Sequence, residues 1–469
     1  MIIMKFGGTS VGSADAINKA ADIVVAEKGA KVVVVSAMSG ITDKLLAISK
    51  KVADMPAPVV EQECNRFYHS ILEQHKRAAE GAIRDGEALD CAQKKIEELC
   101  NELKITLLGI GYLGDLSARS LDFILSYGER LSMIIVAGAL ESRGAKSKAL
   151  TGHEAGIITD SNFGCARPLY KRMKDSVKTA LLPLIEEGIT PVVTGFVAAD
   201  ENAHVTTLGR GGSDYSASLL GRFLDAEEVQ IWTDVDGILS TDPKVVPSAQ
   251  LINRISYVEA MDLAYFGAKV IHSKMIEPAM DADIPVRILN TFNPSCEGTL
   301  ILREKEKIVR VIKAVAIAKD VDILNLRGVG MAETPNIAGR VFNSLGENNI
   351  NILMISGSSE SNLSFVIKKA DVKRAVDLID ENFVGNGIRS LEVMEGVSVI
   401  TVVGVGMTGT KGIAAKIFQT VSDNDVNIIM IAQGSSEVNI SFVVKAEDGS
   451  KVVQALHKRF VDDESKPSK

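Results

Sequence analysis

The chain begins Met1-Ile2-Ile3-Met4-Lys5-Phe6-Gly7-Gly8-Thr9-Ser10, an apolar run that ends in a lysine and a pair of glycines. Residues 32–35 read Val-Val-Val-Val, a second apolar run without the alternation of a half-exposed strand. Such runs predict strands covered on both faces, as in a parallel sheet. Between them, Ser13 is placed to cap a helix over residues 14–27. This start therefore predicts a layered α/β domain.

The same alternation of strands and helices continues to about residue 300. Further strands are predicted at Thr190–Thr194, Val229–Thr233 and Pro285–Leu289, and residues 55–105 have the pattern of amphipathic helices. We therefore predict one large α/β domain over residues 1–300.

The last third of the chain contains an internal repeat. Residues 321–369 begin VDILNLRGVGM and continue to NILMISGSSESNLSFVIKK, while residues 397–445 begin VSVITVVGVGM and continue to NIIMIAQGSSEVNISFVVK. Two spaced matches with a single insertion indicate two copies of one small module. Each copy has the pattern strand, glycine turn, helix, strand, strand, helix.

The two copies end differently. A strand near Ser390–Val393 closes the first copy, whereas the second ends in the polar tail VDDESKPSK. We therefore expect a segment before the repeats, Lys307–Ile312, to supply the missing strand. The predicted domains are 1–300, then 314–395, then a discontinuous module of 301–313 plus 396–460, and a tail over 461–469.

Composition narrows the functional classes. With 52 Lys+Arg and 60 Asp+Glu in 469 residues, the net charge of −8 argues against general attraction to nucleic acid or to an acidic membrane surface. No apolar run reaches the ~20 residues of a membrane span. The five cysteines include no CxxC pair and the six histidines are scattered. We expect reduced thiols, a cytoplasmic location and no metal site made of protein ligands alone.

Two glycine-rich turns carry cations. Gly7 and Gly8 follow Lys5 at the end of the first strand, where backbone amides and a nearby helix N-terminus can receive a phosphate. Arg210 lies among glycines in Thr207–Ser216, and its guanidinium suits a carboxylate or a phosphate. Ser213 or Asp214 can cap a helix over about 215–224. The alternative for each is a purely structural turn.

Four further motifs lie near strand ends or in apolar segments. They are the acidic Ile231–Gly237, the lysine-bearing Phe266–His272, the glutamate in Ser126–Leu131, and the hydroxyl-rich Ser36–Thr42. For the glutamate, an ion pair with its neighbour Arg130 is the structural alternative. Because open α/β sheets bind ligands at the carboxyl ends of their strands, the motifs together favour a nucleotide and a small anionic substrate. Phosphoryl transfer fits, since it depends mainly on positioning and charge neutralisation.

In this order, the motifs KFGGTSVGS, YGERL, TLGRGGSDYSA, IWTDVDGI, TDP and FGAKVIH resemble those of the aspartate kinases. The resemblance covers essentially the whole chain. It implies an amino acid kinase fold, a carbamate kinase-like three-layer αβα sandwich, followed by two βαββαβ ACT domains. It further implies ATP-dependent phosphorylation of the L-aspartate side chain to 4-phospho-L-aspartate, the first step towards lysine, threonine and methionine. Mg²⁺ would accompany ATP.

The resemblance also assigns roles to individual residues. The catalytic set is Lys5, Asp214 and Lys269, and the aspartate-binding set is Ser36, Thr42, Glu129, Arg210 and Ser213. The ATP-binding set is Lys5, Phe6, Gly7, Gly8, Thr233, Asp234, Leu239, Lys244, Lys269 and Val270. Many members have tyrosine in place of Leu239 and arginine in place of Lys244, and the usual proline is Ser273 here.

The ACT repeats imply an allosteric amino acid and a homodimer through these repeats, with a tetramer as the alternative. The predicted effector contacts are Gly330, Met331, Ile337, Ala338, Asn351 and Ile352, and the second copy is expected to be structural. Leu353 stands where lysine-sensitive members tend to carry an acid. The resemblance therefore favours threonine over lysine as the effector.

Two other functions are alternatives to aspartate kinase activity. The first is another kinase of the same fold, acting on glutamate, acetylglutamate or a nucleotide. The second is an amino-acid-binding regulatory protein without catalytic activity. The tandem repeats oppose the first, and the presence of Lys5, Glu129, Arg210, Asp234 and Lys269 opposes the second. The short tail predicts a chain without a fused homoserine dehydrogenase.

Overall fold

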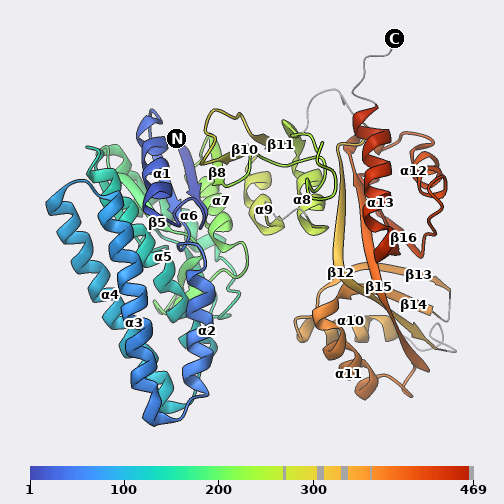
Figure 1. Cartoon of the computed structure of the whole chain (residues 1–469), viewed down its shortest axis with the longest axis horizontal. Helices are drawn as coiled ribbons and strands as arrows, with labels where there is room; N and C mark the ends of the chain where they lie inside the picture. Colours follow the sequence, from blue (N-terminus) through green and yellow to red (C-terminus); the bar gives the residue numbers. More distant parts are fainter. Residues whose placement is uncertain (268–270, 304–310, 329–335, 360–361, 464–469) are drawn as a thin grey trace. The chain divides into compact units, whose positions relative to one another are not determined.

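The structure, a computed structural model, describes residues 1–267, 271–303, 311–328, 336–359 and 362–463 (Figure 1). The chain divides into two compact units. The first comprises residues 1–238, 253–257 and 270–303, and the second comprises 239–252, 258–269 and 304–469. Residues 239–252 and 258–269 therefore group with the repeats, although the sequence placed them in a domain that ends at residue 300.

An eight-stranded sheet forms the centre of the first unit. Its order is β3 (Ser147–Leu150), β5 (Thr190–Thr194), β2 (Lys31–Val35), β1 (Ile2–Phe6), β8 (Glu228–Thr233), β10 (Val286–Asn290), β11 (Thr299–Leu302) and β9 (Arg254–Ser256). All neighbours are parallel except β10 and β11. The five predicted strands are confirmed to within one residue, because apolar runs without alternation mark strands that are covered on both faces.

Helices cover both faces of this sheet. Met4 and Phe6 share one core with the helices α1 (Ala14–Ala26), α2 (Ile41–Ala53), α3 (Ala57–Ala82), α4 (Gly86–Leu113) and α5 (Ala118–Glu141). Ile3 points to the opposite face, where it lies near Gly221 of α7 (Gly212–Phe223). The helices α6 (Tyr170–Glu186) and α9 (Ser273–Asp281) join α7, through contacts to β5 and to α7. The first unit is thus a three-layer αβα sandwich.

Local chemistry explains where α1 and α7 begin. The Ser13 hydroxyl accepts from the Ala16 N–H at 3.2 Å, which confirms the predicted cap. The predicted cap of α7 by Ser213 or Asp214 is wrong, because the helix already begins at Gly212 with Gly211 in the left-handed region. Both side chains lie inside the first turn and are left available for other contacts.

The helix α5 meets the length and hydropathy expected of a membrane span. However, 89% of its most apolar window is buried within the protein, as in the core helix of a globular domain. A small three-stranded sheet of β4 (Ile158–Thr159), β6 (Val197–Asp200) and β7 (Val205–Thr207) completes the first unit. All five cysteines are free.

The second unit is built on a six-stranded antiparallel sheet. Its order is β13 (Ile352–Ser359), β14 (Asn362–Lys368), β12 (Ala314–Arg327), β15 (Ser390–Val403), β17 (Asn439–Lys445) and β16 (Met430–Gln433). The helices are α10 (Ile337–Glu347), α11 (Val372–Asn382), α12 (Ile413–Ser422) and α13 (Ala446–His457), together with most of α8 (Tyr257–Tyr265). In Figure 1, α13 runs alongside β12 and β15.

The two repeats share their long strands β12 and β15. Ser390–Val397 of β15 belongs with the first copy, and Val397–Val403 pairs with β17 of the second. Ala314–Ala318, the start of β12, pairs with Val399–Val403 and so supplies the extra strand of the second copy. The sequence had pointed to Lys307–Ile312 for this strand, and residues 307–310 lie outside the described ones.

Candidate active site

Lys5 lies near the carboxyl end of β1, between Val34 of β2 and Ile231 of β8. The residue is 8% exposed, and its Nζ forms an ion pair of 2.5 Å with Oδ1 of Asp214 in the first turn of α7. Two of the three predicted catalytic residues therefore meet at one point. The third, Lys269, and its neighbour Val270 lie outside the described residues.

The turn after β1 is tied to both neighbouring strands. The Gly7 N–H donates to the Trp232 carbonyl at 3.0 Å, and the Ser39 N–H donates to the Gly8 carbonyl at 3.1 Å. A Cβ on Gly8 would lie 3.0 Å from the Ala37 carbonyl oxygen. The paired glycines thus allow the ends of β1 and β2 to approach closely beside Lys5.

Glu129 carries a buried carboxyl group in the first unit. Its residue is 3% exposed, and its Oε2 has no hydrogen-bond partner among the described residues. Burial raises the pKa of the carboxyl to about 8, against the opposing effects of the Ala37 N–H and the Lys5 ammonium. Arg130, its expected structural partner, pairs instead with Glu102 at 3.0 Å. A buried acceptor without a partner is costly unless a ligand satisfies it.

Hydroxyl groups lie at the end of β2 and the start of α2. Ser36 follows β2 directly, and its N–H donates to the Phe6 carbonyl at 3.1 Å. Thr42 is the second residue of α2. Both residues are half-buried. The end of β2 thus brings Ser36 beside the β1 turn.

The Arg210 turn joins β7 to α7. Gly209 and Gly211 flank the exposed Arg210 with φ values of 74° and 73°, which glycine tolerates best. A side chain on Gly211 would also collide with His272, at 2.5 Å from its Cβ. Ser213, in the same turn, lies against Gly195, on which a Cβ would approach the Ser213 Cβ to 2.6 Å.

Asp122 supports this turn, and the sequence analysis missed it. It lies on α5, seven residues and hence two helical turns before Glu129, on the same face. Its carboxylate accepts from the N–H groups of Gly164 and Thr207 and from the Thr207 hydroxyl at 2.8–2.9 Å. Burial raises the pKa of Asp122, and these donors oppose the rise. One helix therefore fixes both Glu129 and the approach to Arg210.

Comparisons with known proteins identify the family of the chain. Residues 1–290 match the amino acid kinase family, and residues 324–383 and 400–460 match an ACT domain. The chain is 32% identical over 468 residues to the chloroplastic aspartokinase 2 of Arabidopsis thaliana, covering 98% of this chain and 84% of that protein. The chain belongs to the aspartokinases of the amino acid kinase family.

Solved structures extend the likeness to the fold. Aspartokinase III of E. coli, crystallised with aspartate and ADP in an R-state, matches with a TM-score of 0.83 at 30% identity, over 98% of this chain and 99% of that one. The same enzyme with lysine and aspartate in a T-state matches with a TM-score of 0.79 at 30% identity and the same coverage. The expected aspartokinase fold, an α/β kinase domain followed by ACT domains, is thereby confirmed.

The nucleotide-binding residues predicted for this aspartokinase fall in different parts of the chain. Thr233 ends β8, and its hydroxyl donates to Asp234 at 3.1 Å. Asp236 accepts from the side-chain amides of Asn290 at 2.8 Å and Asn293 at 3.0 Å. Leu239 and Lys244 belong to the second unit. The motif IWTDVDGI, residues 231–238, thus ends where the first unit gives way to the second along the chain.

Some of the predicted effector contacts can be placed. Ile337 and Ala338 open α10, after Asn336 in the left-handed region at φ 67°. Asn351 is exposed and precedes Ile352, the first residue of β13, whose carbonyl accepts from the Tyr265 hydroxyl at 2.5 Å. Gly330 and Met331 lie outside the described residues.

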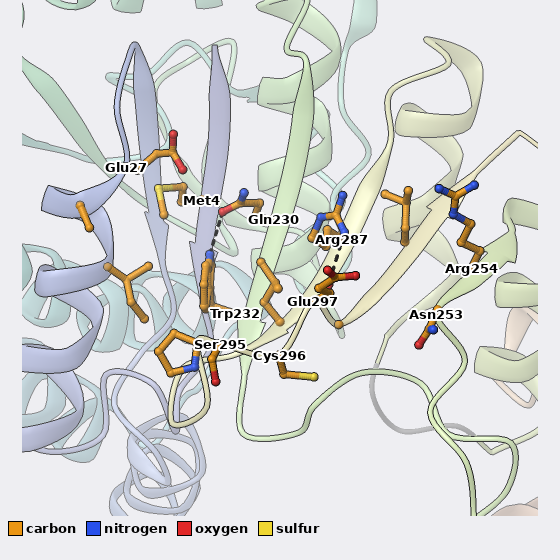
Figure 2. A pocket seen from close by; sticks show the side chains of 16 residues that line it. Met4, Glu27, Gln230, Trp232, Asn253, Arg254, Arg287, Ser295, Cys296 and Glu297 are labelled. Carbon is orange, nitrogen blue, oxygen red and sulfur yellow. Dashed lines mark hydrogen bonds between the residues drawn. The ribbon is translucent and has the colours of Figure 1, made fainter.

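A separate hollow of about 720 Å³ opens on the sheet face beside the end of α1 (Figure 2). Of its lining residues, Trp232 donates from Nε1 to Gln230 at 3.0 Å. Gln230 and Arg287 both contact the adjacent Glu228, at 3.0 Å and 3.1 Å. These side chains satisfy one another. Of the predicted catalytic and aspartate-binding residues that the structure describes, none lines this hollow, so it is distinct from the site at Lys5.

Proposed function

We propose that this aspartokinase binds L-aspartate between Glu129 and Arg210 and transfers the γ-phosphoryl group of ATP to its side-chain carboxylate beside Lys5. The observation that carries the proposal is Glu129 Oε2, a buried carboxylate oxygen without a partner among the described residues. The α-ammonium of an amino acid supplies the positive charge and the donors that this oxygen lacks. Arg210 is the matching cation for the α-carboxylate.

Charge neutralisation accounts for the rest of the chemistry. The side-chain carboxylate of aspartate has a reference pKa of ~3.9, so it is ionised at neutral pH and needs no general base. A carboxylate oxygen attacks the γ-phosphorus and ADP leaves. The barrier comes from bringing two anions together, and the Lys5 ammonium, held by Asp214 at 2.5 Å, stabilises the charge between them. Lys269 is proposed to act on the other side of the transferred group.

The carboxylates near this site fit Mg²⁺ that arrives with ATP better than an ion held by the protein. Asp214 is paired with Lys5, and Asp236 is bonded to two asparagine amides. Among the described residues, no group of three or more His, Cys, Asp or Glu side chains could hold a metal ion. When bound with ATP, Mg²⁺ would neutralise phosphate charge.

The substrate is tested by measuring ADP release from purified protein with ATP and Mg²⁺. Aspartate, glutamate and N-acetylglutamate are offered separately at equal concentrations. Turnover with aspartate, and much slower turnover with the two others, is the expected result. Absence of turnover with aspartate would refute the proposal, and turnover with another acid alone would favour a different kinase of this fold.

The proposed effector is threonine, with lysine as the alternative. The first repeat offers Ile337, Ala338, Asn351 and Ile352, and Leu353 is an apolar side chain that is 9% exposed. An apolar group there gives no counter-charge to a second ammonium. Threonine and lysine are titrated separately in the aspartate assay, and inhibition at lower concentrations of threonine is expected. Stronger inhibition by lysine would overturn the choice.

We propose a homodimer through the repeats, with a tetramer as the alternative. Several large apolar side chains are exposed on strands of the second unit, namely Ile355 at 46%, Val393 at 38%, Met394 at 41% and Ile431 at 46%. Exposed apolar side chains on one sheet are candidates for burial against a second copy of the chain. Light scattering of the full chain should give twice the 50.2 kDa monomer mass. A monomer at assay concentration would contradict this assembly.

A further inference from the structure

The segment 239–252 is part of the second unit, although its sequence continues the kinase motif IWTDVDGI. Leu239 and Leu251 form an antiparallel bridge, and the Ser240 N–H donates to the Gln250 carbonyl at 2.8 Å, which closes the segment into a loop. Val245 and Val246 are 7% and 8% exposed and pack in one core with the second repeat. The loop thus packs against the core of the second repeat.

Buried polar contacts fix the loop to the end of the chain. The Ser240 hydroxyl lies 2.8 Å from Nε2 of His457, the last residue of α13. Nδ1 of the same ring lies 3.3 Å from Oδ2 of Asp462. Gln250 Nε2 donates to Oδ1 of Asp462 at 3.2 Å. The cluster Ser240–His457–Asp462 therefore holds both ends of the loop.

Two more bonds surround this cluster. Gln454, one turn before His457 on α13, donates to the Val245 carbonyl at 2.9 Å. The Val315 N–H donates to the Ser240 carbonyl at 2.8 Å. The loop is consequently held from α13 and from the first residues of β12. All these partners come from the second repeat or from the strand that completes it.

The order Ser, His, Asp also occurs in hydrolases, but this cluster cannot act in that way. Ser240 and His457 are 1% and 0% exposed, so no substrate reaches the hydroxyl. The Ser240 oxygen also accepts from the Gln250 N–H at 2.9 Å. The Ser240 hydroxyl thus accepts one hydrogen bond and can donate its proton to His457 Nε2, so both of its contacts are structural. The cluster can position the loop but cannot attack a carbonyl group.

We propose that His457, through Ser240 and Asp462, is a positioning residue for nucleotide binding. The loop that it holds carries Leu239 and the exposed Lys244, so the inference rests on the proposed assignment of these two residues to the ATP site. The aspartate-binding side chains Glu129 and Arg210 lie in the first unit. Loss of the His457 contacts should therefore weaken ATP binding and leave aspartate binding nearly unchanged.

Two substitutions separate the two contacts of the ring. His457→Gln can keep a nitrogen near the place of Nε2 and the bond to Ser240, whereas His457→Asn can keep one near the place of Nδ1 facing Asp462. We expect His457→Asn to raise the KM for ATP by roughly three- to tenfold, the effect of one buried hydrogen bond, and His457→Gln to raise it less. The KM for aspartate should change less than twofold in both.

A matched control is His75→Gln. His75 is also a helical histidine with 0% exposure, and its Nδ1 is bonded to the Ile71 carbonyl at 2.8 Å within the first unit. This variant should lower the melting temperature and leave both KM values unchanged. If His457→Asn shifts the two KM values equally, or neither, the positioning role is overturned.

Ser240→Ala provides a smaller change if the histidine variants fail to fold. It removes the hydroxyl and should raise the KM for ATP without a further increase when combined with His457→Asn. Additive effects of the two substitutions would contradict a shared contact. Wild-type turnover with aspartate is measured in the same assay. If the wild type is inactive with aspartate, the proposed function fails, whereas an active wild type with unaltered variants defeats only this inference.

Discussion

Glu129 in the first unit and His457 in the second are both fully enclosed ionisable side chains, but their surroundings differ. Glu129 keeps one oxygen without a partner among the described residues. In His457, Nε2 is bonded to the Ser240 hydroxyl at 2.8 Å, while Nδ1 makes no hydrogen bond within the described part of the chain and lies 3.3 Å from the Asp462 carboxylate. A buried acceptor without a donor gains most from a ligand, whereas a ring that is already bonded to Ser240 and faces a carboxylate gains most from staying in place. This difference favours a substrate-binding role for Glu129 and a positioning role for His457.

The same contrast distinguishes the two regulatory repeats. In the second, the Val405 N–H at the glycine turn donates to Glu259 of α8 at 2.7 Å, and Glu259 also pairs with Lys313 at 2.9 Å. Asn439 of the same repeat donates to Asp262 at 2.8 Å. In the first repeat, the described core around α10 and α11 consists of that repeat's own residues, and the Tyr265 hydroxyl of α8 donates to the Ile352 carbonyl at 2.5 Å. The carboxylates of α8 thus contact the second repeat and its tyrosine contacts the first, so two similar sequences have different partners.

The largest expected effect comes from Lys5. Lys5→Met removes the ammonium beside Asp214 and should lower kcat by roughly a thousandfold, since charge stabilisation in the transition state is lost. Steady-state ADP release measures it. Lys31→Met is the control, because Lys31 lies at the amino-terminal end of the neighbouring strand β2, away from the end that carries Lys5. Activity in Lys5→Met close to that of the control would contradict the catalytic role of Lys5 at the carboxyl end of β1.

Glu129→Gln should raise the KM for aspartate by roughly a hundredfold, because a buried charge pair with the ammonium is replaced by a neutral amide. The KM for ATP should stay within about twofold of the wild type. Glu102→Gln, which removes only the surface partner of Arg130, serves as the control and should leave both constants unchanged. An unchanged aspartate KM in Glu129→Gln would make this carboxyl structural.

The pKa of Glu129 predicts a pH dependence. With a value of about 8, the carboxyl is mostly protonated at pH 6 and half ionised at pH 8. Only the ionised form pairs with the ammonium of aspartate, so kcat/KM for aspartate should rise by roughly fiftyfold from pH 6 to pH 8. Glu129→Gln should flatten this rise. A wild-type profile that is level over this range would show that Glu129 does not receive the substrate.

The same titration has a consequence for stability. Because the folded-state pKa lies above the unfolded one, the contribution of Glu129 to stability is present at low pH and is lost as the pH rises towards 8. Bound aspartate restores a partner to the ionised carboxyl. Aspartate should therefore raise the melting temperature more at pH 8 than at pH 6, and an equal increase at both would count against the pairing.

Asp122 gives the smallest effect on activity. Asp122→Ala leaves three donors of Gly164 and Thr207 without their acceptor, and should lower the free energy of unfolding by about 3 kcal/mol. Through the Arg210 turn, it should raise the KM for aspartate only a few-fold. Urea unfolding and steady-state kinetics measure the two effects. Asp122→Asn, which keeps an acceptor oxygen, should recover most of the stability, and equal losses in both variants would contradict this role.

Much of the first unit could be predicted because its determinants are local. Apolar runs without alternation marked the buried parallel strands, and Ser13 marked the start of α1. Lys5 and Asp214 were identified through motifs, and the fold brings them to 2.5 Å. The sequence could not decide between an ion pair and a ligand role for Glu129, since that depends on Arg130 turning to Glu102.

The second unit was harder to predict because its determinants are distant in the chain. Ser240 and His457 are 217 positions apart, and no local pattern joins them. Ala314 pairs with Val403 of β15, and no local pattern in the sequence joins these two positions. Most of Lys307–Ile312, the segment that the sequence favoured for this strand, lies outside the described residues. Asp122 carried one usable signal, its position two turns before Glu129 on one helix face.

The central claim is that Glu129 binds the substrate, whereas His457 positions the loop of residues 239–252. It is tested most directly by measuring the KM values for aspartate and for ATP, side by side, in Glu129→Gln and His457→Asn. The account predicts that Glu129→Gln raises only the KM for aspartate and that His457→Asn raises only the KM for ATP. Variants that raise the same KM, or that raise both in proportion, would contradict it.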